Sequence, residues 1–279
     1  MERPRALGYR PTMGTIRPVG EHLREWRQRR RLSQLALACD AEISTKHLSF
    51  LETGRAQPSR EMVLRLAERL EVPLREQNVL LVSAGYAPVF AERRLADPAL
   101  QAARHAIDLV LSGHEPYPAL AVDRHWTMVT ANTAVQRLLA GVDPAMLAPP
   151  VNVLRLSLHP GGLAPRIANF AEWRAHLLAR LRRQIDVTAD PVLVELLNEL
   201  SSHPKPAMPA GRKPAPIDDV GGVVVPFRLA TDGGILSFIS TTTVFGTPVD
   251  VTLSELAVES FFPADAATAE ALRHMAGRA

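Results

Sequence analysis

Apolar residues recur at helical spacing through residues 19–84, in short runs separated by capping and turn residues. In the first run, Val19, Leu23 and Trp26 fall at positions i, i+4 and i+7, so they share one face of a helix. Serine hydroxyls cap helix N-termini well, and serines precede the next three runs: Ser33, Ser44 and Ser59. Glycines and a proline mark other boundaries: Gly54, Pro73 and Gly85. This pattern predicts five short helices in one all-α domain.

The pattern changes beyond residue 87. Helical spacing continues in four separate segments: residues 97–113, 132–141, 168–185 and 190–202. Apolar runs with β-branched residues predict four strands: residues 118–123, 127–131, 220–230 and 235–245. The last two flank the sequence "DGG", a strong hairpin signal, and residues 254–263 fit either a strand or a helix. Strands, helices and then strands again favour an antiparallel sheet covered by helices on one side.

Together these segments predict an α+β, multidomain chain. The expected parts are a flexible arm over residues 1–18, the all-α five-helix domain over 19–87, a connector over 88–104, the sheet domain with its covering helices over 105–272, and a tail over 273–279. Residues 203–219 are proline-rich and lack apolar periodicity, so we expect a surface loop there.

Charge differs between the two parts of the chain. Residues 1–96 carry 17 Lys/Arg and 11 Asp/Glu, whereas residues 97–279 carry 15 and 18. A basic N-terminal part indicates a polyanionic partner, and the mildly acidic remainder indicates another task. The single cysteine, Cys39, excludes a disulfide within the chain and favours a reducing cytoplasm. No apolar run resembles a signal peptide or approaches the ~18 residues of a membrane span, so we expect no membrane partner.

Residues 34–53 have the spacing of two short helices that cross steeply. Ala38 is small where the helices would touch, and four apolar residues would fill the wedge between them: Leu37, Ile43, Leu48 and Leu51. The other positions of the second helix would face outward or lie at its flanks: Thr45, Lys46, His47, Ser49 and Phe50. In a helix-turn-helix, such a second helix enters the major groove of DNA.

Residues 19–85 resemble the phage-repressor, or XRE-type, helix-turn-helix, on "LSQLALA" and "ISTKHLSFLETGRAQPSREMVLRLAERLEV". The resemblance implies double-stranded DNA as a partner. The DNA-binding residues that we predict from it are Ser33, Gln34, Ser44, Thr45, Lys46, His47, Ser49, Arg55 and Gln57. Among them, Thr45, Lys46 and Ser49 would read the groove, Arg55 and Gln57 would contact the backbone, and His47 fits a flanking contact or a bystander.

The same resemblance implies an internal salt bridge from Glu52 to Arg30 or Arg31. The arginine run over residues 27–31 fits a phosphate clamp and a solvated helix face equally well. Asp40 and Glu42 fall in the turn and should face away from the bases. Glu42 stands where glycine is usual, because a left-handed conformation is favoured there, at a cost of about 1 kcal/mol for another residue.

The C-terminal half carries no catalytic signature. Its one His-Glu pair, in "HEPYP", lacks the second histidine of a zinc protease. It has no phosphate loop, dinucleotide fingerprint or nucleophile elbow, and the nine histidines show no metal-ligand spacing. We therefore expect no catalytic residue, no metal and no cofactor other than a possible bound fatty acid or similar apolar ligand.

Residues 118–139 resemble the opening of a PAS domain. The wider region 105–272 resembles the ligand-binding domain of MmyB-like transcription regulators, on "HPGGLAPRIANFAEW" and "GTPVDVTLSELAVESFFPAD". The resemblance implies a PAS-like domain that holds a small, hydrophobic, fatty-acid-like ligand.

Residues of the expected strands and their cover supply the lining for such a pocket. The predicted lining residues are Trp126, Phe227, Phe238 and Phe245, with Phe170, Trp173 and Ile239 in the same segments. In a polar, glycine-bearing loop, the candidates for contact with the ligand's head group are His159, Arg166 and Asn169. The alternative stays open: the aromatic residues only pack in the core, and Arg166 is structural.

These expectations converge on a cytoplasmic, DNA-binding transcription regulator. A homodimer would read a near-palindromic operator and respond to a hydrophobic ligand. In the alternative, the C-terminal domain binds no ligand and only dimerises or contacts the transcription machinery.

Overall fold

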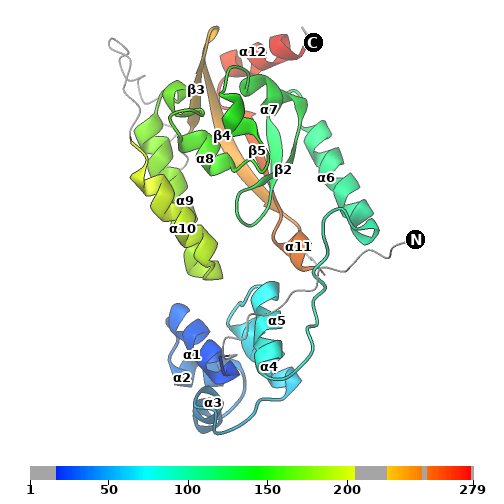
Figure 1. Ribbon diagram of the computed structural model, residues 1–279, viewed down its shortest axis with the longest axis vertical. Helices are drawn as coiled ribbons and strands as arrows, with labels where there is room; N and C mark the ends of the chain where they lie inside the picture. The colour runs from blue at the N-terminus through cyan, green and yellow to red at the C-terminus, as the bar shows by residue number, and fades with distance from the viewer. Residues whose placement is uncertain (1–16, 205–224, 247–249, 278–279) are drawn as a thin grey trace, which may run out of the picture. The chain divides into compact units, whose positions relative to one another are not determined.

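The computed structural model describes residues 17–204, 225–246 and 250–277. The chain divides into two compact units, residues 1–91 and 92–279. The first unit is helical, and the second combines an antiparallel sheet with helices (Figure 1). This confirms the predicted fold class. Most of the expected arm and most of the expected proline-rich loop lie outside the described residues.

The described residues of the first unit form five helices. They are α1 (Val19–Arg29), α2 (Gln34–Asp40), α3 (Thr45–Glu52), α4 (Arg60–Arg69) and α5 (Leu74–Ser83). The predicted serine caps are confirmed, since Ser33, Ser44 and Ser59 each accept a hydrogen bond from a backbone N–H three residues ahead. The apolar stripes of the five helices meet in a core that includes Leu23, Leu37, Leu48, Leu51, Leu66 and Leu81, all at 0% exposure.

Residues with a left-handed backbone conformation end or connect these helices where the sequence predicts them. Gly54 and Gly85 have φ angles of 71° and 85°. Glu42, in the turn between α2 and α3, has a φ of 55°. The turn therefore has the conformation that favours glycine, although a glutamate occupies it.

The second unit is built on a five-stranded sheet in the order β2-β1-β5-β4-β3, with every neighbouring pair antiparallel. The strands are β1 (Ala119–Val122), β2 (Met128–Ala131), β3 (Phe227–Thr231), β4 (Gly234–Val244) and β5 (Ala257–Pro263). Thr231 pairs with Gly234, which confirms the predicted hairpin at "DGG". The ambiguous segment 254–263 is resolved, because most of it forms the central strand β5.

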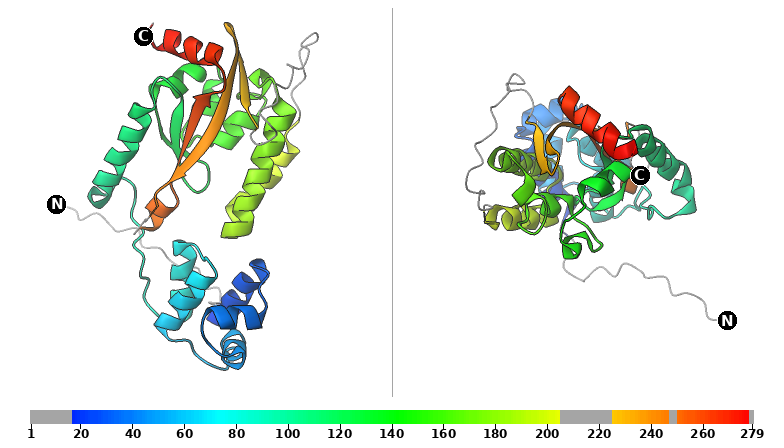
Figure 2. Two further views of the ribbon diagram at one scale, coloured as in Figure 1. Left: turned by 180° about the vertical axis from the view of Figure 1, so that it is seen from behind. Right: turned by 90° about the horizontal axis from the view of Figure 1, so that it is seen from above.

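Helices cover both faces of this sheet, so the expectation of a cover on one side only was wrong. One face packs against α7 (Thr133–Leu138), α8 (Val153–Leu158), α9 (Phe170–Thr188) and α10 (Pro191–Ser202), which enclose the main core. The other face carries Ala119, Ala121 and Val258, which pack against α6 (Gln101–Gly113). In Figures 1 and 2 the α9–α10 pair and α6 lie on opposite sides of the sheet. The remaining elements are η1 (Pro98–Leu100), η2 (Pro144–Leu147), η3 (Ala164–Arg166), α11 (Val251–Ser254) and α12 (Ala266–Gly277).

Two expected boundaries in this unit were wrong. Phe245 does not belong to a strand, because β4 ends one residue earlier, and its side chain packs against the smaller core under α6. The expected tail from residue 273 is helical as far as Gly277, because Leu272 and Met275 hold α12 against the main core.

The described part of the chain contains no helix long and apolar enough to cross a membrane.

Candidate DNA interface and ligand pocket

The N-terminal ends of α2 and α3 keep hydrogen-bond donors on their surface. Ser33 Oγ accepts a hydrogen bond from Ala36 N at 3.0 Å, and Ser44 Oγ accepts one from His47 N at 3.1 Å. Each hydroxyl therefore still has its own hydrogen to donate. Both serines are exposed, at helix ends whose backbone N–H groups favour an anion.

A row of polar side chains follows on α3. Within the described residues, the side chains of Thr45, Lys46, His47 and Ser49 make no hydrogen bond to the protein. Lys46 is exposed and the other three are half-buried. Side-chain donors and acceptors that a helix leaves unpaired are the groups that can pair with base edges.

Phe50 holds two cations beside this row. Lys46 Nζ lies 5.7 Å and Arg55 Cζ 5.9 Å from the centre of the Phe50 ring. Both distances are within the range of a cation–π contact. Phe50 thus positions one cation on α3 and one in the loop that follows it.

A buried carboxylate fixes α3 against the helices before it. Glu52, only 3% exposed, accepts hydrogen bonds from Arg27 Nε at 2.6 Å and Arg27 Nη2 at 2.9 Å. Gln34 Nε2 donates to the same carboxylate at 2.8 Å. Burial raises the pKa of Glu52, but the hydrogen bonds from Arg27 and Gln34 outweigh it and leave the pKa below its usual value. The charged carboxylate is therefore the form built into the unit.

The predicted partners of Glu52, Arg30 and Arg31, were wrong. Arg30 instead donates to the carbonyls of Leu70 and Glu71 at the end of α4, and Arg31 lies beyond the end of α1. The reason lies in the crossing of the two helices. A Cβ on Gly20 would lie 2.2 Å from the Leu51 carbonyl, so α1 touches α3 at Gly20. Arg27, seven residues on, shares that face of α1.

The arginine run is mostly structural. Arg27 and Arg30 have the internal partners just described, and Arg29 pairs with Glu25 at 2.9 Å. Two of the predicted DNA-binding residues also have internal partners: Gln34 bonds to Glu52, and Gln57 Nε2 donates to the Ala84 carbonyl at 3.0 Å. Each amide keeps its second N–H for another acceptor.

Asp40 and Glu42 lie beside α4. Both line a shallow groove together with four charged residues of that helix: Glu61, Arg65, Glu68 and Arg69. The carboxylates of the turn therefore lie among the charges of α4.

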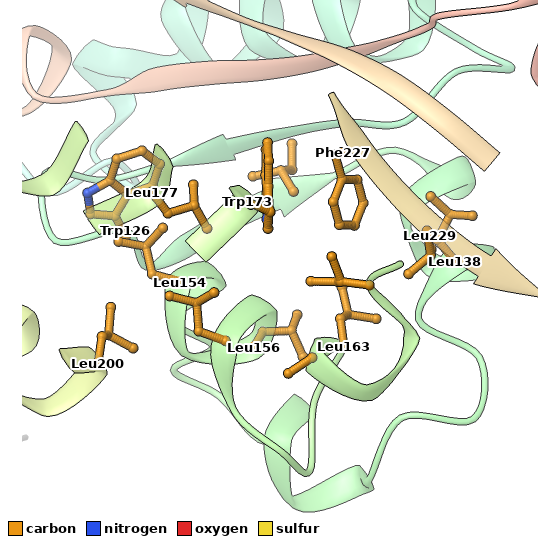
Figure 3. Packing of buried hydrophobic residues seen from close by; sticks show 14 of the residues in the cluster. Trp126, Leu138, Leu154, Leu156, Leu163, Trp173, Leu177, Leu200, Phe227 and Leu229 are labelled. Carbon is orange, nitrogen blue, oxygen red and sulfur yellow. The ribbon is translucent and has the colours of Figure 1, made fainter. Parts of the chain in front are cut away.

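The second unit encloses a cavity of about 100 Å³ between the sheet and α7–α9. Its wall is almost entirely apolar, and it includes three of the predicted lining residues, Trp126, Phe227 and Phe238. Trp173 and Phe227 lie side by side in this core, with ring centres 5.0 Å apart (Figure 3). Leucines from α7, α8, α9 and β3 complete much of the wall: Leu138, Leu154, Leu156, Leu177 and Leu229.

A polar corner interrupts this apolar wall. Arg180 Nη1 on α9 donates to Glu259 Oε2 on β5 at 2.9 Å, and Arg180 Nη2 donates to the other carboxylate oxygen and to Thr242. The Thr242 hydroxyl in turn donates to Glu259 Oε1 at 2.9 Å. Ser157 is the other polar group of the wall, and it accepts a hydrogen bond from Trp173 Nε1 at 3.0 Å.

Trp126 closes the cavity beside this corner. The Arg180 guanidinium carbon lies 4.5 Å from the centre of the Trp126 ring, and Trp126 Nε1 donates to Gln184 at 2.7 Å. Trp126 has a φ of 66°. That left-handed conformation is costly for a bulky residue and is found where the surroundings hold it in place.

Comparisons with known proteins agree with this two-part architecture. A family model described as the MmyB-like transcription regulator ligand binding domain matches residues 103–275, which is more than half of the chain. The chain belongs to the MmyB-like transcription regulators. A helix-turn-helix domain model matches residues 18–80 of this regulator. It is therefore a transcription regulator with a DNA-binding helix-turn-helix and a ligand-binding domain.

One solved structure similar to this MmyB-like regulator is the clp gene regulator ClgR from Corynebacterium glutamicum. The two are 25% identical, and the match covers 38% of this chain and 99% of that chain, with a TM-score of 0.23. None of the curated proteins matches the MmyB-like regulator.

The predicted head-group residues of the MmyB-like regulator do not line its cavity. Arg166 donates to the carbonyls of Leu138, Ala140 and Ala230, which is a structural role. Asn169 Nδ2 donates to the Pro226 carbonyl at 2.8 Å, and His159 lies 5.2 Å from the His203 ring. The polar loop thus ties η3 to β3 instead of facing the cavity, and Phe245 also lies outside its wall.

Sequence reasoning missed the polar corner of the regulator's cavity. Arg180 lies in the basic run "LARLRR", where nothing distinguishes it from its solvated neighbours. Glu259 did carry a signal, since it is the one charged residue within the apolar run "AVESFF". Among the described residues, no group of three or more His, Cys, Asp or Glu side chains could hold a metal.

Proposed function

We propose that this regulator binds a near-palindromic, double-stranded operator as a homodimer, and that α3 reads the bases. The proposal rests on the polar side chains of α3 that make no hydrogen bond to the described part of the protein. Thr45, Lys46 and Ser49 would contact base edges, and His47 would lie at the flank. Two copies of α3 about one DNA turn, ~34 Å, apart would read two half-sites.

Phosphates would bind around this helix. The free hydroxyl hydrogens of Ser33 and Ser44, at two helix N-termini, suit phosphate oxygens. Arg55, held over Phe50, would add a cation, and the second N–H of Gln34 and Gln57 would add donors. Such contacts fix the position on DNA without selecting a sequence.

In the second unit, the regulator would sense a small hydrophobic ligand of the fatty-acid type. The apolar cavity lined by Trp126, Phe227 and Phe238 supports this ligand class. Its volume of about 100 Å³ is below the ~300–1,000 Å³ of typical ligand pockets. A fatty-acid-like ligand would therefore require side chains of the wall to move.

The same small volume favours a second candidate function. In that case the C-terminal domain binds no ligand, and it only dimerises or contacts the transcription machinery. Native mass spectrometry of gently purified, full-length protein separates the two candidates. Additional mass of a lipid, lost on delipidation, supports the sensor, whereas a bare dimer before and after delipidation supports the alternative.

The operator proposal is tested by selecting bound fragments from a random DNA pool with full-length protein. Two related half-sites separated by about one turn would support it, and recovery of unrelated sequences would contradict it.

Replacing Lys46 with Ala then tests the reading helix. If Lys46 contacts a base, we expect about a tenfold or greater loss of affinity for the selected operator and a smaller loss for unrelated DNA. A matched control, Arg182→Ala, removes one exposed positive charge from the other unit. An equal loss on all sequences would make Lys46 a phosphate contact.

A further inference from the structure

Arg180 lies between two hollows of the second unit. On one side is the apolar cavity of about 100 Å³, and on the other is an open groove of about 500 Å³. Arg180 lines both. Residues of α9 and β4 line the rest of the groove, together with Val225, which lies two residues before β3. The residues from the two elements are His176, Arg183, Gln184, Val187, Ser240 and Thr242.

The groove is cationic. Arg180 and Arg183 supply two guanidinium groups, and no carboxylate is among the described residues that line it. Burial lowers the pKa of His176, and the charges of Arg180 and Arg183 lower it further, against smaller opposing effects of Glu259 and Glu172. An anion in the groove would therefore meet the guanidinium group of Arg183, the guanidinium group of Arg180, which is already paired with Glu259, and an imidazole whose pKa is lowered.

Side chains of the groove and of the cavity contact one another beside Arg180. Trp126 lines the cavity and bonds to Gln184, which lines the groove. The Arg180 guanidinium covers the Trp126 ring and bonds to Glu259 on the cavity side. The left-handed backbone of Trp126 places its ring at this contact between the two hollows.

We propose that the groove is the head-group site and entrance for a single-chain anionic amphiphile. Its carboxylate binds Arg180 and Arg183, and its alkyl chain passes between Arg180 and Trp126 into the cavity. This inference rests on the proposed ligand-sensing function and adds the anion-binding residues and the direction of entry.

The two parts of such a ligand have different energetic roles. Each methylene buried in the cavity strengthens binding about fourfold. The carboxylate binds guanidinium groups through charge-assisted hydrogen bonds. When Arg180 turns toward the ligand, Glu259 keeps its hydrogen bond from Thr242 but loses its charged partner, so part of the ligand's binding energy offsets that loss. The cavity is smaller than the ~150 Å³ that holds benzene, so the alkyl chain enters only as Arg180 and Trp126 move apart.

The test compares decanoate with decan-1-ol, which has the same chain length and no charge. Calorimetric titration uses the full-length protein. We expect decanoate to bind at least about tenfold more tightly than decan-1-ol, with a difference that shrinks as salt is added.

Arg183→Gln is the informative variant, because Arg183 takes no part in the Arg180–Glu259–Thr242 network and its loss leaves the core intact. It should weaken decanoate about five- to tenfold and leave decan-1-ol unchanged. Arg182→Gln, an exposed neighbour outside the groove, is the matched control and should change neither affinity.

Equal affinities for decanoate and decan-1-ol would overturn the head-group site while ligand sensing survived. Equal effects of Arg183→Gln and Arg182→Gln would overturn it too. Binding of neither compound would overturn the inference together with the proposed sensing of a fatty-acid-like ligand.

Discussion

Glu52 shows how strongly one buried ion pair can determine the helix-turn-helix unit. Glu52 is 3% exposed, and each of its carboxylate oxygens accepts a hydrogen bond from Arg27. Arg27→Met should lower the free energy of unfolding of the first unit by about 3 kcal/mol, because it leaves the buried carboxylate only the longer contact with Arg24, at 3.6 Å, and the hydrogen bond from Gln34.

The matched control for this prediction is Arg29→Met, which breaks the more exposed pair with Glu25. We expect a loss of less than about 1 kcal/mol there. Urea unfolding with hydrogen exchange of the α3 amides measures both. Similar losses for the two variants would show that the buried pair is no more important than a surface pair.

The lowered pKa of Glu52 also predicts how acid affects this unit. Burial opposes ionisation, but the bonds from Arg27 and Gln34 prevail, so the folded-state pKa lies below the unfolded value of about 4.3. Unfolding then binds a proton, and the stabilisation present above that pH is lost as pH falls through the folded-state pKa. Stability measured from pH 7 to 3 should fall less steeply in Glu52→Gln, and an unchanged slope would contradict the prediction.

At the scale of elements, the contact between α1 and α3 places the reading helix. A Cβ on Gly20 would lie 2.2 Å from the Leu51 carbonyl, and backbone cannot yield as a flexible side chain can. Gly20→Ala should therefore destabilise the unit by about 2–3 kcal/mol and weaken operator binding, since α3 must shift. Gly113→Ala, where a Cβ meets open space, should be nearly neutral in stability and in DNA binding. Thermal unfolding and operator titration test both variants.

Elements governed by local chemistry could be predicted from the sequence. Ser33, Ser44 and Ser59 each cap a helix through a hydrogen bond that spans only three residues. The "DGG" turn is equally local and determines the β3–β4 hairpin. Contacts between elements that are distant in the sequence could not be predicted from it. The Arg27–Glu52 pair depends on the close crossing at Gly20, and the Arg180–Glu259 pair joins residues 79 positions apart. The same distinction applies to the cavity. Part of its aromatic lining could be predicted from the expected strands and their cover, whereas its polar corner could not, because Arg180 and Glu259 meet only when α9 packs on the sheet.

At the scale of the whole molecule, the regulator combines a DNA-binding unit and a ligand-binding unit in one chain. If ligand and operator favour different arrangements of a dimer, their binding is coupled, and the coupling must be reciprocal. Saturating decanoate should change operator affinity by a factor within the typical 5–150-fold range, and saturating operator should change decanoate affinity by the same factor.

Arg183→Gln makes this coupling prediction specific. The variant should require about five- to tenfold more decanoate to reach half of the effect, yet reach the same factor at saturation, because weaker binding does not alter the preference between two arrangements. Fluorescence anisotropy of labelled operator measures operator affinity, and calorimetry measures decanoate affinity. Unchanged operator affinity under saturating decanoate would favour the candidate function in which DNA binding is independent of ligand.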